Sequence, residues 1–151
     1  MHDFKPIATA VTAVTAGFLL AGTATAEPGD LFIIHELDQP PAAAAAQVRF
    51  FTETEEDWLF LAEFDLAGGA VTALKICYPA IGPDVVAAGM HTMAMMPCGH
   101  LAFYEEEGQS MLSMLDMSFM TTLDPHPRLE DAVTTARPAF ADMLSEVLDV
   151  E

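Results

Sequence analysis

Five short apolar segments, each bounded by glycine, proline or acidic turn residues, constrain the fold of this chain most strongly. Alternation and turn chemistry predict strands over 30–37, 57–66, 70–78, 93–106 and 109–117. Helices are predicted from Pro40 onward, over 82–91 and over 123–150, the last broken or kinked at Pro138. Strands mixed with helices in a chain of this length predict an α+β sandwich, in which helices cover one face of a mainly antiparallel sheet.

The N-terminus has the pattern of a secretory signal peptide. Lys5 precedes an apolar run over 6–22, which ends at the small residues Ala24-Thr25-Ala26. The run is shorter than the roughly 20 strongly apolar residues of a membrane anchor, and no basic cluster follows it. We therefore predict cleavage after Ala26, no stable membrane anchor after cleavage, and a periplasmic or secreted domain over 27–151.

The chain is strongly acidic. It carries 23 Asp and Glu against 5 Lys and Arg, so its net charge is −18, and removal of residues 1–26 leaves that value unchanged. Such a surface excludes binding to nucleic acid or anionic lipid, because both require clustered basic side chains. It would attract cations or a basic partner, such as a basic periplasmic redox protein.

Two cysteines remain in the predicted mature chain, Cys77 and Cys98. Their spacing lacks the C-x-x-C of a thioredoxin-like site and the C-x-x-C-H of covalent haem attachment. An exported protein may oxidise such a pair to a disulfide. However, they lie at the end of one predicted strand and the start of the next, with a helix between, so we expect two free thiols.

The stretch "MHTMAMMPCGH" over 90–100 concentrates soft donors. If 95–104 is a strand, alternation buries Leu101 and Phe103 under the helices and places Met96, Cys98 and His100 on the opposite face, about 6.6 Å apart. Thioether, thiolate and imidazole favour Cu(I) or haem iron over Ca²⁺ or Mg²⁺. The sequence therefore predicts a copper or haem b site, for which the candidates are His91, Cys98 and His100 as cofactor ligands and Met96, Cys98, His100 and Cys77 as metal ligands.

A second interpretation needs no ligand. Methionine fills irregular apolar space, so the methionine-rich face would be an oligomer interface of a structural or interaction domain. The methionines at 111, 114, 117 and 120 are assigned to packing. No nucleophile with an orienting base is identifiable, so we predict a binding protein rather than an enzyme. The isolated His35 and His126 are expected at the surface or at helix caps.

The motifs "ICYP" (76–79) and "MMPCGHLAFYEEEGQ" (95–109), followed by a returning strand and a terminal helix, resemble the family called domain of unknown function 302. The resemblance implies a compact α+β fold of ferredoxin-like character and a homo-oligomer. Cys77 and Cys98 fall on the family's two cysteine positions, whereas Tyr78 replaces its usual asparagine. The resemblance supplies no catalytic residue.

Overall fold

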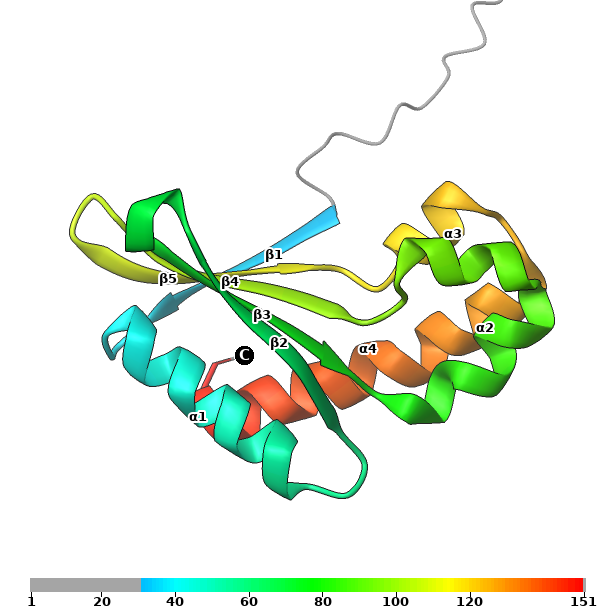
Figure 1. Ribbon diagram of the computed structural model, residues 1–151, viewed down its shortest axis with the longest axis horizontal. Coiled ribbons are helices and arrows are strands. Elements are labelled where there is room, and N and C mark those ends of the chain that lie inside the picture. The colour runs from blue at the N-terminus through cyan, green and yellow to red at the C-terminus, as the bar shows by residue number, and fades with distance from the viewer. Residues whose placement is uncertain (1–30, 151) are drawn as a thin grey trace, which may run out of the picture.

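The computed structural model describes residues 31–150, in which a five-stranded antiparallel sheet forms one layer (Figure 1). The spatial order is β1-β5-β4-β3-β2, so the two N-terminal strands occupy opposite edges. Every neighbouring pair is antiparallel. The strands are β1 (Phe32–Leu37), β2 (Leu59–Leu66), β3 (Val71–Cys77), β4 (Gly99–Glu106) and β5 (Gln109–Leu115).

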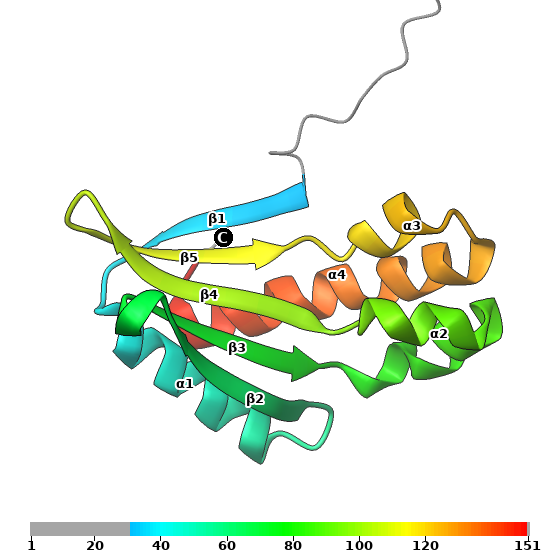
Figure 2. The same ribbon diagram turned by 45° about the horizontal axis from the view of Figure 1, so that its top comes forward.

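The helices form the second layer. Figure 2 shows α1 and α4 on one side of the sheet, while α2 and α3 extend past one end of it. This arrangement confirms the predicted α+β architecture, with an additional short helix before the terminal one. The helices are α1 (Pro41–Thr54), α2 (Gly82–Ala88), α3 (Phe119–Leu123) and α4 (Pro127–Leu148), and short 3₁₀ segments lie at Ala67–Gly69, Pro79–Ile81 and Met90–Met95.

The core lies between the sheet and the α1–α4 layer. Leu101 and Phe103 on β4 are buried, which agrees with the predicted strand faces. Phe140 on α4 is fully buried and packs edge-on against Trp58, with ring centroids 4.9 Å apart. Gly99 opens β4 under this ring, and a Cβ there would lie 2.7 Å from Phe140 Cζ. The absent side chain at Gly99 therefore lets the helix approach the sheet.

The predicted break at Pro138 does not occur. Helix α4 runs without interruption from Pro127 to Leu148. Proline removes one backbone donor, but the buried stripe of α4 continues on both sides of it, from Leu129 to Leu148. Burial of that stripe against the core keeps the two halves in one helix.

No helix among residues 31–150 combines the length and the apolar character needed to cross a membrane. The predicted signal peptide, residues 1–26, lies outside the described residues.

Candidate functional site

The soft-donor stretch does not form the predicted strand at its start. Residues Met90–Met95 are 3₁₀-helical, Met96 has a left-handed backbone (φ 47°), and β4 begins only at Gly99. The Cys98 N–H donates to Met96 O at 2.7 Å, which closes a tight turn around Pro97. Because this turn precedes the strand, Met96 does not share a strand face with Cys98 and His100.

Cys77 and Cys98 are joined by a disulfide, with their Cα atoms 4.5 Å apart. The prediction of two free thiols is therefore wrong. Strands β3 and β4 are antiparallel, and Ile76 pairs with Gly99. The connection through α2 thus returns the chain to the point where β3 ended, which brings the end of one strand beside the start of the next.

Lys75 and His100 form a cross-strand pair next to the disulfide. Lys75 Nζ lies 2.7 Å from His100 Nε2 and donates to Met96 O at 2.9 Å. Lys75 is only 7% exposed, and burial lowers its pKa. Burial also lowers the pKa of His100, and the neighbouring Lys75 charge lowers it further. Neutral His100 therefore accepts a hydrogen bond from the Lys75 ammonium, and its lone pair is already occupied.

The lowered pKa of His100 predicts a pH dependence of folding. The unfolded chain binds a proton at His100 near the ordinary pKa of 6.5, whereas the folded protein binds it only at lower pH. The stabilisation is therefore present above pH 6.5 and is lost as the pH falls below it. We expect His100→Gln, which keeps an acceptor for Lys75, to flatten this slope in urea titrations between about pH 7 and pH 5. Parallel wild-type and variant curves would contradict this assignment.

Four sulfur-bearing side chains line one apolar groove, here called the sulfur groove. They are Cys77, Met93, Met96 and Cys98, and the groove has a volume of about 430 Å³. Met93 and Met96 are well exposed, whereas Cys98 is nearly buried. The remaining lining residues are Leu59, Leu61, Tyr78, Pro79, Ile81, Gly82, Val85, Val86 and Pro97. No lining side chain carries a carboxylate, so the donors of this groove are almost purely soft.

His91 lies apart from the sulfur groove. Its Nε2 is 2.9 Å from Asp124 Oδ2, and it lines a separate cavity of about 360 Å³ together with Met95 and Leu123. The structure therefore brings Cys77, Cys98 and Met96 together but leaves His91 elsewhere. Across residues 31–150, no three His, Cys, Asp or Glu side chains form a group that could hold a metal ion.

The sequence analysis did not identify Met93 or Lys75 as residues of the candidate site. Met93 comes to the groove because Met90–Met95 is helical rather than extended. Lys75 was detectable in principle, because it precedes Cys77 by two residues on β3 and so shares its face.

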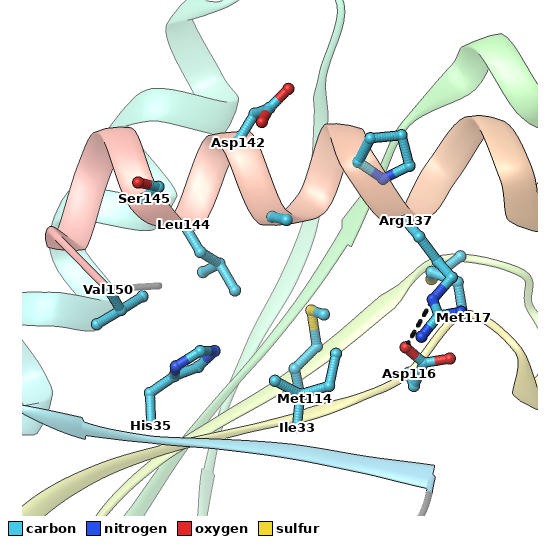
Figure 3. A pocket seen from close by; sticks show the side chains of 12 residues that line it. Ile33, His35, Met114, Asp116, Met117, Arg137, Asp142, Leu144, Ser145 and Val150 are labelled. Carbon is cyan, nitrogen blue, oxygen red and sulfur yellow. Dashed lines mark ion pairs between the residues drawn. The ribbon is translucent and has the colours of Figure 1, made fainter.

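A third cavity lies between α4 and the β1–β5 edge of the sheet. Its volume is about 500 Å³, and His35 on β1 and Leu144 on α4 point into it from opposite sides (Figure 3). Burial lowers the pKa of His35, so the imidazole is neutral. At one end Arg137 Nε lies 3.1 Å from the buried Asp116 carboxylate. His35 thus lines a cavity, whereas His126 caps α4 as expected, accepting from Arg128 N at 3.1 Å.

A family model described as "Domain of unknown function DUF302" matches residues 41–149. The chain belongs to the DUF302 family. The match reaches back through α1 and β2, well beyond the C-terminal motifs that carry the resemblance in the sequence, and it confirms that resemblance.

One solved structure similar to this DUF302 domain is titled "Crystal structure of uncharacterized conserved protein DUF302 from Bacillus stearothermophilus". The two chains are 14% identical, with a TM-score of 0.66, and the match covers 78% of this chain and 98% of that chain. At this level of sequence identity, the structural similarity between the two chains establishes the fold alone. No curated protein matches the chain.

Proposed function

We propose that this DUF302 domain is a binding module for a soft metal ion, with Cu(I) as the preferred ion and the sulfur groove as the site. The observation that carries the proposal is the convergence of two cysteines and two methionines on one groove. Thiolates and thioethers favour Cu(I), whereas Ca²⁺ and Mg²⁺ require oxygen ligands. The groove residues that would hold the ion are Cys77, Cys98, Met93 and Met96.

His100 is left out of this ligand set. Its imidazole accepts a hydrogen bond from Lys75, and an ammonium at that distance would oppose a second cation. Haem b is an alternative that rests on the sequence alone, because His100 does not line the cavity beside His91.

The disulfide makes the proposed binding dependent on redox state. A dithiol reductant would transfer two electrons and two protons to the Cys77–Cys98 bond, which breaks as the reductant's own sulfurs form a disulfide. The two thiols would then release their protons as they bind the metal. Lys75, about 7 Å from Cys77 along the same strand face, would favour the thiolates. The oxidised domain offers only two thioethers and should bind weakly.

The proposal includes export of the domain to the periplasm or the cell exterior. The signal-peptide pattern over 1–26 supports it, and so does the disulfide, because such bonds persist mainly in oxidising compartments. A basic redox partner would suit both the net charge of −18 and the need for a reductant.

Competition with a colorimetric Cu(I) chelator under anaerobic conditions tests the proposal. We expect the reduced mature domain to bind one Cu(I) per chain and the oxidised domain to bind too weakly to compete with the chelator. Cys98→Ser should weaken binding at least tenfold, about 1.4 kcal/mol, because it removes a thiolate. Met114→Leu, at a methionine buried in β5 away from the groove, is the matched control and should leave binding unchanged.

Two further variants distinguish metal binding in the sulfur groove from metal binding by other sets of ligands. The double variant Met93→Leu/Met96→Leu should weaken binding if the ion sits in the groove, whereas two thiols acting alone would be insensitive to it. His100→Gln should have no effect on affinity in this proposal, although the sequence-based set included His100. Reduced wild type that binds no copper, or a Cys98→Ser variant that binds as wild type does, would refute the proposal.

A further inference from the structure

One face of the sheet is left without helices. The register of the five strands places three rows of side chains on the side opposite α1 and α4 (Figures 1 and 2). At one end α3 borders this face, where Phe119 packs edge-on against His100. We call this surface the open face, and its three rows together contain fifteen residues. They are Phe32, Leu115, His100, Lys75 and Ala62 in the first row, Ile34, Ser113, Ala102, Ala73 and Phe64 in the second, and Glu36, Met111, Tyr104, Val71 and Leu66 in the third.

The open face is apolar and nearly uncharged. Phe32, Ile34, Phe64 and Leu66 are each about half exposed, from 49% to 56%. Among the acidic residues within 31–150, Glu36 alone belongs to these fifteen positions, at their edge, and the ammonium of Lys75 in the first row is buried. Depletion of charge in a contiguous apolar patch distinguishes the core of a protein interface from ordinary surface.

The size of the open face meets the requirement of a stable dimer. Five strands about 4.8 Å apart and three rows about 7 Å apart cover roughly 500 Å². Two such faces in contact would bury about 1,000 Å² or more, which is the lower limit for a specific interface. Leu59 and Leu61 continue the apolar surface beyond the first row and would add to this area.

The net charge of the chain indicates which kind of molecule could cover the open face. A chain of net charge −18 is repelled by anionic lipid and by nucleic acid, and also by another copy of itself at any acidic surface. On the open face, two copies can meet without opposing rows of carboxylates.

We propose that the domain forms a symmetric dimer in which the open faces of two copies pack against each other. Two-fold symmetry lets the same patch serve both partners. Face-to-face sheets pack about 10 Å apart, so the side chains of the two middle rows would interdigitate, with the large residues Ile34 and Phe64 at the two ends of each row. Cys77 lies just beyond Lys75 on β3, so the sulfur groove borders one end of this contact and not its middle row.

Sedimentation velocity of the mature, oxidised, copper-free domain over a wide concentration range tests the dimer. Wild type should sediment as a dimer. Phe64→Glu and Ile34→Glu each place a carboxylate in the middle row of the contact against the partner's apolar face, and each should weaken dimerisation about a hundredfold or more. Phe50→Glu is the matched control: Phe50 is 68% exposed on α1, on the opposite side of the molecule, and its replacement should leave the dimer intact. Circular dichroism verifies that all variants are folded.

Three results would overturn the proposal. They are a wild type that stays monomeric at the highest concentration, a dimer that survives Phe64→Glu and Ile34→Glu, and a dimer that Phe50→Glu disrupts equally. A monomer that co-sediments with uncharged phosphatidylcholine vesicles, and loses this binding on Phe64→Glu, would assign the open face to lipid instead. Because copper is absent throughout, failure here leaves the sulfur groove untouched.

Discussion

Phe140→Ala should lower the free energy of unfolding by about 3–5 kcal/mol, the cost typical of removing a fully buried aromatic ring. Phe140 joins three parts of the core: it lies on α4, packs edge-on against Trp58, and covers Gly99 at the start of β4. Truncation leaves a cavity that cannot be filled from the strand side, because Gly99 has no side chain. The neighbouring atoms would then lose both apolar burial and van der Waals contact.

Urea titration of the oxidised domain measures this loss. Phe50→Ala removes the same atoms from a largely exposed ring on α1 and should change stability by less than about 0.5 kcal/mol. An unchanged urea dependence of the unfolding free energy in both variants would verify that the denatured states are comparable. Equal losses in the two variants would show that Phe140 does not occupy the core position described above.

Removal of the disulfide should lower the free energy of unfolding by about 3 kcal/mol. The bond joins residues 21 positions apart, and closing a loop of that length restricts the unfolded chain by about this amount. The double variant Cys77→Ser/Cys98→Ser and the chemically reduced wild type should lose similar stability. Titration of the denatured, unreduced wild type should find no reactive thiol.

The stability lost on removal of the disulfide provides a second test of the proposed metal site. A ligand that binds only the folded, reduced domain restores stability in proportion to the logarithm of its concentration over its dissociation constant. Copper should therefore raise the unfolding midpoint of the reduced wild type but not that of Cys77→Ser/Cys98→Ser. Two reactive thiols in the unreduced protein would contradict the disulfide. A loss well below 1 kcal/mol would mean that the segment between the cysteines is already restricted in the unfolded state.

Several features of the fold follow from local sequence pattern. Alternation predicts the strands, because successive side chains of a strand point to opposite faces; it identified Leu101 and Phe103 as core residues, and both are buried. Glycine, proline and acidic turns predict where elements end, and the observed order of elements agrees. The family resemblance in the C-terminal motifs is confirmed by the match over residues 41–149.

The candidate site was predictable only in part. The concentration of soft donors in 90–100 pointed to the segment that supplies Met93, Met96 and Cys98 to the sulfur groove. The observed strand β4 begins at Gly99, six residues after the start of the strand predicted over 93–106. The residues before it form the Met90–Met95 segment, which packs against α2, and the left-handed Met96, and local alternation indicates neither feature. Alternation therefore misplaced Met96 and gave no indication of Met93.

Local sequence pattern identifies most of the helices and strands and the apolar side of each strand, because these properties depend on near neighbours along the chain. The strand order β1-β5-β4-β3-β2, the antiparallel pairing that joins Cys77 to Cys98, and the contact between Lys75 and His100 could be seen only in the folded structure. These features depend on contacts between segments far apart in sequence, and many pairings satisfy the same local pattern. The packing of one shared core, with the helices on a single face, selects among them and leaves the other face of the sheet open.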